Sequence, residues 1–94
     1  MWSYLVKKVR IRVFGDVQGV FYRYSAKKLA HKLGLKGWCR NEGDGSVQMV
    51  IEGDPQLIDS FVDWSKKGPP MARVDKIEVN EETRGAAEGK FEVR

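Results

Sequence analysis

Residues 9–23 read VRIRVFGDVQGVFYR, and this stretch decides the fold. In its first part the apolar residues Val9, Ile11 and Val13 alternate with arginines, which is the two-residue period of a strand with one face on a core. A short segment with two glycines follows, and a helical pattern begins at its end. The stretch therefore predicts a strand, a loop and a helix in that order.

The helical pattern that follows this loop extends to residue 33. Gly34 comes next, and glycine is the residue type favoured just beyond a helix C-terminus. Farther along the chain, Asp54 and Pro55 open a second helix as N-cap and first-turn proline, and the Gly-Pro-Pro of residues 68–70 ends it. The apolar residues at helical spacing are Tyr22, Ala26, Leu29, Ala30 and Leu33 in the first helix, and Leu57, Ile58, Phe61, Val62 and Trp64 in the second.

Four further strands are predicted. Residues 36–41 form the second strand, and Val47, Met49 and Ile51 alternate in the third, with Asp44-Gly45 marking an antiparallel hairpin turn between them. Residues 85–89 are expected to form a polar loop. The fourth strand is marked by Ile77 and Val79, and a short terminal strand by Phe91 and Val93.

This order of elements predicts an α+β fold. Strand-helix-strand-strand-helix-strand, with a short fifth strand, is the order of the ferredoxin-like split βαβ sandwich, in which two helices pack on one face of an antiparallel sheet of four to five strands. The chain has 94 residues, so we expect residues 1–94 to form a single domain. Because this fold hosts many functions, the function has to be argued from a site.

Composition narrows the class of partner. The net charge of +4 would draw anions to a concave site, but acidic and basic residues are interspersed, so no nucleic-acid partner is expected. The single cysteine excludes an intrachain disulfide, and no apolar segment has the length of a signal peptide or a membrane span. We expect a cytoplasmic protein without a membrane partner, and a monomer.

The loop before the first helix is a candidate anion site. Residues 15–20 join a strand to a helix start, where backbone N–H groups lack intrahelical partners and the helix dipole favours negative charge. Arg23, on the first turn, can reach back over this loop with a planar charged fork. The loop is not a nucleotide-binding P-loop, because Val20 and Phe21 follow Gly19 where Lys and Ser or Thr are needed. By itself it predicts anion binding only.

Two longer motifs extend this prediction. Residues 14–23, FGDVQGVFYR, resemble the first signature of the acylphosphatase family, and residues 37–47, GWCRNEGDGSV, closing at Gly53, resemble the second. The likeness continues through residues 68–74, GPPMARV, and so covers nearly the whole chain. Tyr22 stands where the family usually has Phe or Met, and a few extra residues precede the first strand.

The resemblance implies a hydrolase that cleaves the carboxyl-phosphate bond of small-molecule acyl phosphates to a carboxylate and inorganic phosphate. It implies no metal, no cofactor and no phosphoenzyme. Its catalytic residues would be Arg23 and Asn41, with Arg23 and the loop amides holding the phosphate and Asn41 orienting the attacking water. The phosphate-binding residues would be Gly15, Asp16, Val17, Gln18, Gly19, Val20 and Arg23.

Other reactive residues have ordinary structural explanations. His31 lies on the polar side of the first helix and is expected at the surface. Cys39 alternates in a strand and is expected to be a small core residue rather than a nucleophile. Glu42 and Asp44 are expected to be solvated hairpin residues rather than an acid–base pair.

Two competing functions use the same fold. An RNA-binding module would stack bases on aromatic residues of the open sheet face, where Trp38 stands among Arg10, Arg12 and Arg40. The third strand, however, is expected to present Gln48, Val50 and Glu52 on that face rather than aromatic residues. A non-catalytic anion sensor would share the loop but would not need Asn41.

Overall fold

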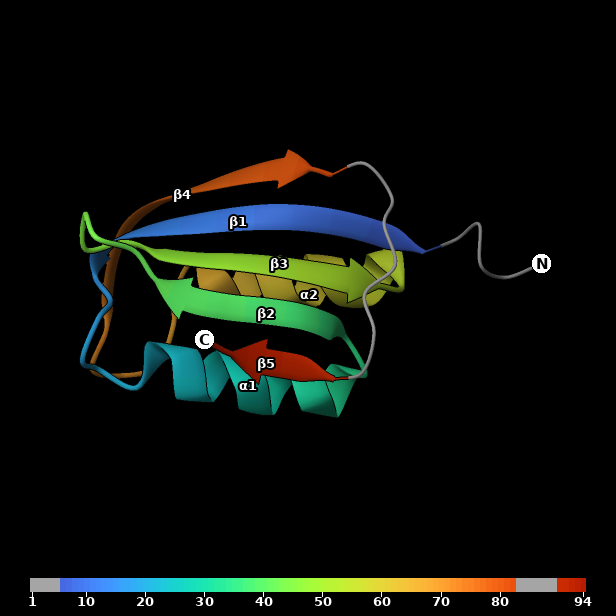
Figure 1. The fold of residues 1–94 in the computed structure, drawn as a ribbon, viewed down its shortest axis with the longest axis horizontal. Coiled ribbons are helices and arrows are strands. Elements are labelled where there is room, and N and C mark those ends of the chain that lie inside the picture. The colour runs from blue at the N-terminus through green and yellow to red at the C-terminus, as the bar shows by residue number, and fades with distance from the viewer. Residues whose placement is uncertain (1–5, 83–89) are drawn as a thin grey trace.

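The computed structural model describes residues 6–82 and 90–94. Its strands form one sheet in the order β4-β1-β3-β2-β5, and both helices lie on one face of that sheet (Figure 1). This arrangement confirms the predicted ferredoxin-like sandwich. In chain order the elements are β1 (Lys7–Asp16), α1 (Tyr22–Leu33), β2 (Lys36–Asn41), β3 (Val47–Gly53), α2 (Pro55–Ser65), β4 (Arg73–Glu81) and β5 (Phe91–Val93).

The element boundaries follow the predicted signals closely. Asp54 caps α2, with its carboxylate accepting from the backbone N–H of Gln56 at 2.8 Å, and Gly34 ends α1 in the left-handed conformation. β1 extends beyond the alternating residues at both ends. Residues 7 and 8 pair with β3, and residues 14–16 pair with β4. The polar loop predicted at residues 85–89 lies outside the described residues. Neither α1 nor α2 is long and apolar enough to cross a membrane.

The sheet is mixed rather than wholly antiparallel. β1 runs antiparallel to both of its neighbours and β2 runs antiparallel to β3, but β5 pairs parallel with β2, placing Phe91 opposite Gly37 and Val93 opposite Cys39. Alternation reports which faces a strand presents and not its direction. The sequence pattern therefore predicted β5 without predicting its orientation.

The core lies between the sheet and the two helices. The inward side chains of β1 and β3, such as Ile11 and Met49, are fully buried in this layer. Ala26, a residue with a short side chain, is fully buried on the inner face of α1. Tyr22 fills the space between the helices, where its hydroxyl donates to the carbonyl of Ser65 at 2.8 Å, and burial raises the pKa of Tyr22. Tyr22 therefore joins the start of α1 to the end of α2.

The outer face of β3 differs from the prediction. Gln48 and Val50 were expected to lie exposed on the open face, but both are buried. Trp38 pairs across from Val50, and Gln48 accepts a hydrogen bond from Arg10 and donates to Glu42. Long side chains of the neighbouring strands therefore cover the centre of this face, which single-strand alternation does not predict.

Gly15 lies at an irregularity of β1, where the register with β4 shifts between Phe14 and Gly15. Its φ is +137°, and a Cβ at this position would lie 2.2 Å from the carbonyl oxygen of Arg73 and 2.8 Å from the amide nitrogen of Asp75. β4 therefore passes too close for any side chain. The bulge re-aims β1 toward α1 just before the loop begins.

We predict that Gly15→Ala lowers the free energy of unfolding by about 3 kcal/mol, because it adds backbone strain to a clash with backbone atoms that cannot move aside. Urea unfolding followed by circular dichroism measures this. The matched control is Gly43→Ala, since a Cβ at Gly43 meets nothing within 4 Å. The control should stay within about 0.5 kcal/mol of the wild type, and equal losses in the two variants would contradict the prediction.

Candidate functional site

A short loop, residues 17–21, joins β1 to α1. Because β1 continues through Asp16, Gly15 and Asp16 lie in the strand opposite Val74 and Arg73. The free part of the predicted anion loop therefore consists of Val17, Gln18, Gly19 and Val20. Gly19 takes a φ of +76°, which lets the chain turn back toward the helix.

The N-terminus of α1 has no side-chain cap. Its N-cap residue is Phe21, which holds the left-handed conformation at φ 64°, and its first turn contains no acidic residue. Left-handed φ is rare for a bulky residue, so this conformation is strained. The first backbone N–H groups of α1 are thus left for an external acceptor, in contrast to α2, where Asp54 accepts from two amides.

Gln18 fixes the loop to the β2–β3 hairpin. Its side-chain amide donates to the carbonyl of Glu42 at 2.8 Å and to that of Ser46 at 3.0 Å. The Gln18 side chain therefore points to the hairpin that follows Asn41. Only its backbone amide is left for a bound anion.

Arg23 is half-buried on the first turn of α1. One terminal nitrogen of its guanidinium donates to the backbone carbonyl of Arg94 at 2.8 Å, which orients the group. Within residues 6–82 and 90–94, no Asp or Glu side chain forms an ion pair with it. Its charge and its remaining N–H groups are therefore available to a ligand.

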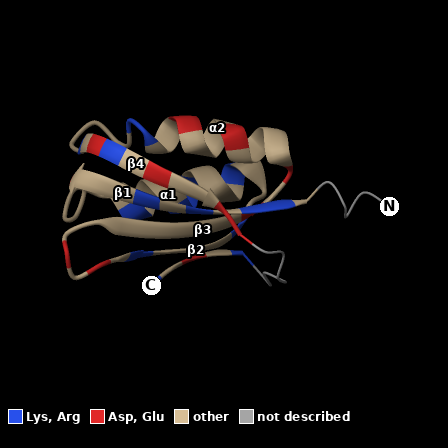
Figure 2. Cartoon of the chain, turned by 90° about the horizontal axis from the view of Figure 1, so that it is seen from above, with Lys and Arg blue, Asp and Glu red and all other residues tan. Residues whose placement is uncertain are grey.

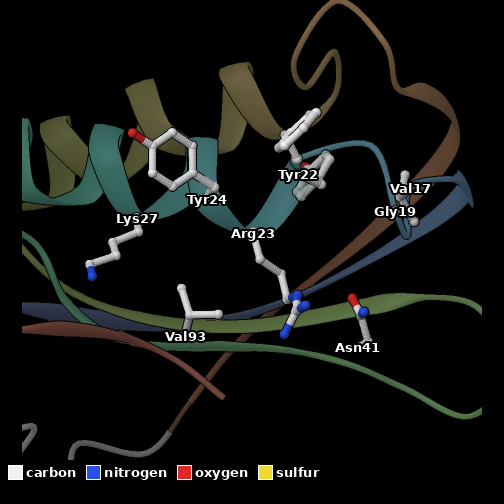
Figure 3. A pocket seen from close by; sticks show the side chains of 9 residues that line it. Val17, Gly19, Tyr22, Arg23, Tyr24, Lys27, Asn41 and Val93 are labelled. Atoms are coloured by element: carbon white, nitrogen blue, oxygen red, sulfur yellow. The ribbon is translucent and has the colours of Figure 1, made fainter.

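Asn41 is the last residue of β2 and is exposed. Figure 3 shows its carboxamide and the Arg23 guanidinium pointing into the same space between α1 and the sheet. In the described part of the chain, no group hydrogen-bonds to this carboxamide. Asn41 can therefore both donate to and accept from a bound water.

These groups share one cavity of about 450 Å³. Of the residues predicted for the site, the cavity brings together Val17, Gly19, Arg23 and Asn41. It also includes residues that the sequence analysis did not assign to a site: Phe21, Tyr22, Tyr24, Lys27 and Val93. Lys27 follows Arg23 by four residues and was detectable from helical spacing. Val93 was not, because its position depends on the parallel pairing of β5.

Known proteins are similar to this chain in both sequence and fold. The sequence model of the family Acylphosphatase matches residues 9–93. An acylphosphatase of Thermococcus kodakarensis is 46% identical over 86 residues, which cover 89% of this chain and 94% of that protein. One from Rubrobacter xylanophilus is 48% identical over 88 residues, which cover 94% and 80%. The solved structure of an acylphosphatase from Coxiella burnetii superposes with a TM-score of 0.93 at 34% identity and covers 98% of this chain and 96% of that one.

The chain belongs to the acylphosphatase family. It is therefore an enzyme that acts on acyl phosphates. The family that the two motifs predicted is confirmed.

The carboxylates beside the acylphosphatase cavity are held ionised. Hydrogen bonds from Arg40 and Gln48 lower the pKa of Glu42, and hydrogen bonds from the side chain and backbone of Ser46 lower the pKa of Asp44. A general base near neutral pH needs the opposite shift. Both are hairpin residues, as predicted, but they were expected to be solvated and are instead held by hydrogen bonds to protein groups.

Cys39 carries a buried thiol in β2, two residues before Asn41. Burial raises its pKa to about 12, although the nearby Arg23 charge acts in the opposite direction. Its side chain contacts the backbone of α1, with the thiol 3.9 Å from the carbonyl oxygen of Arg23. Cys39 is therefore a core residue. His31 is exposed on α1, as predicted, and its Nε2 lies 3.2 Å from the carbonyl oxygen of Phe91.

The open face of the sheet carries the residues of the RNA-binding alternative. Guanidinium groups of Arg94, Arg40 and Arg10 lie 4.9, 5.1 and 5.9 Å from the centre of a Trp38 ring. The aromatic surface that would stack a base is thus already in contact with cations of the same chain. Among the described residues, no group of three or more His, Cys, Asp and Glu side chains is arranged to hold a metal ion.

We predict that Cys39 resists thiol reagents in the native enzyme, because a thiol with a pKa of about 12 contains almost no thiolate at mildly alkaline pH. Reaction with a chromogenic disulfide, followed by absorbance, should be negligible in buffer and complete in guanidinium chloride. Cys39→Ala should retain turnover within about twofold, since the side chain does not reach the cavity. Fast labelling of the folded enzyme would show that Cys39 is reactive.

Proposed function

We propose that the enzyme hydrolyses acyl phosphates in the cavity between the loop and Asn41. The observation that carries the proposal is the meeting of three features at this cavity: an uncapped helix N-terminus, the guanidinium of Arg23, and the carboxamide of Asn41. Each of them suits one part of the reaction.

The phosphate binds at the loop. Backbone N–H groups of residues 17–20 and of the start of α1 donate to its oxygens, and the helix dipole favours its charge. Arg23 adds a charged fork, held in position by the carbonyl of Arg94. Because phosphoryl transfer depends mainly on positioning and electrostatic stabilisation, these contacts also lower the barrier as charge shifts among the oxygens.

Asn41 orients the attacking water. As the water oxygen bonds to phosphorus, the bond between phosphorus and the acyl oxygen breaks, and its electron pair leaves with the carboxylate. The protons of the water pass to the phosphate oxygens and to solvent. A carboxylate is a good leaving group, so an oriented water suffices, and the low pKa of Glu42 and Asp44 is compatible with a reaction that uses no carboxylate base.

We further propose that the enzyme acts as a cytoplasmic monomer with no nucleic-acid partner. Cys39 is free and buried, so the described fold does not rest on a disulfide and does not need an oxidising compartment. The basic residues of the open face are paired with carboxylates, for example Arg12 with Asp44 at 3.1 Å. Light scattering should give the mass of one chain.

We predict that Asn41→Ala lowers kcat for benzoyl phosphate by about a hundredfold while inorganic phosphate still inhibits competitively, because the variant loses orientation of the water but keeps the phosphate contacts. Arg23→Gln should also weaken inhibition by phosphate, since it removes a charge that binds both substrate and product. Steady-state kinetics with a chelator present measures both constants.

The matched control is Arg40→Gln. Arg40 neighbours Asn41 in β2, but its side chain lies on the opposite face of the sheet and pairs with Glu42 at 2.6 Å. This variant should keep kcat and phosphate inhibition near wild-type values. Equal and mild effects of Asn41→Ala and Arg23→Gln would contradict the division of roles, and a wild type that binds phosphate without turnover would indicate an anion sensor.

A further inference from the structure

The cavity is larger than a phosphate and a water require. Its volume of about 450 Å³ is in the range of sites for small organic molecules, about 300–1,000 Å³. The loop, Arg23 and Asn41 form one part of it, and Tyr24, Lys27 and Val93 form another. This second part is where the acyl group of a bound substrate has to lie.

Lys27 places a second cation in the cavity. It follows Arg23 by one helical turn, which separates the two positions by about 6 Å along the axis of α1. Figure 3 shows both side chains extending from α1 toward β5, with Val93 between them. A ligand whose phosphate contacts Arg23 can therefore extend past Val93 to the Lys27 ammonium.

Lys27 has no carboxylate partner within the part of the chain that the structure describes. α1 contains Arg23, Lys27, Lys28 and Lys32 and no acidic residue, so like charges face each other at i,i+4 spacing, which destabilises a helix slightly. α2, in contrast, carries only acidic charges (Figure 2). An anionic ligand would relieve the repulsion on α1.

The space between the two cations is bordered by the apolar side chain of Val93, which is 40% exposed. Apolar side chains around a cavity favour a ligand with a hydrocarbon body. The site therefore matches a molecule with a phosphate at one end, a short carbon body, and a second anionic group at the other end.

We propose that the preferred substrates are acyl phosphates whose acyl group carries a second anionic group, a carboxylate or a phosphate, and that Lys27 binds this group. This inference rests on the proposed function, because it assumes that the phosphate binds at the loop and Arg23. Lys27 then determines specificity, while the reacting atoms stay with Arg23 and Asn41.

The test compares benzoyl phosphate with 4-carboxybenzoyl phosphate, which differ only in a carboxylate at the end far from the phosphate. The wild type should have about a tenfold lower KM for the carboxylated substrate. Lys27→Gln should raise that KM about tenfold, with kcat unchanged, and should leave benzoyl phosphate unaffected. Lys27→Arg should retain the preference. Lys32→Gln removes the same charge from α1 outside the cavity and should change neither KM.

The other possible outcomes distinguish failure of the Lys27 inference from failure of the proposed function. Equal KM values for the two substrates in the wild type, or the same loss on both in Lys27→Gln, would overturn the inference, since Lys27 would then act only as a general attractor of phosphate. In either case turnover of benzoyl phosphate would leave the proposed function standing. Failure of the wild type to turn over either substrate would overturn the proposed function itself. Thermal unfolding checks that Lys27→Gln is folded, as expected for an exposed residue.

Discussion

The backbone N–H groups at the start of α1 have no acceptor of their own, and the site is built around this constraint. A side-chain cap would stabilise α1 by about 1 kcal/mol, but it would occupy the donors that an anion needs. The core offsets this missing stabilisation. Tyr22 and Ala26 are buried on the inner face of α1, and the Tyr22 hydroxyl donates to the carbonyl of Ser65. α1 can remain uncapped because packing, rather than its terminus, holds it in place.

Strand register then brings Asn41 to the same point. Val47 of β3 pairs with Val13 of β1 on one side and with Asn41 of β2 on the other. Asn41 is therefore two strand spacings, about 10 Å, from Val13, which lies three residues before the end of β1. Gln18, in the loop that follows, joins the loop to the hairpin beyond Asn41 by donating to the carbonyls of Glu42 and Ser46. The relative position of loop and carboxamide is thus fixed by the sheet and by one side chain.

Local signals predicted most of the fold, and contacts between distant segments supplied what they missed. Asp54 and Gly34 marked helix ends because capping depends on the residues next to it, and alternation found every strand. The direction of β5 and the burial of Gln48 depend on which strands become neighbours, and a single strand does not encode this. The same limit applies to the site: the motifs named Arg23 and Asn41, but Val93 reaches the cavity only through the parallel pairing of β5.

The charges of the enzyme are distributed unevenly, and this distribution is the link between composition and function. On the open face of the sheet the arginines are paired, Arg10 with Glu82 at 3.0 Å and Arg12 with Asp44 at 3.1 Å. On α1 the cations stand without acidic partners inside the helix. Because paired surface charges largely cancel and unpaired ones add, the positive field is concentrated on the side of the cavity. A net charge of +4 thus becomes a local anion attraction, which suits an enzyme of the acylphosphatase family, whose substrates carry a phosphate.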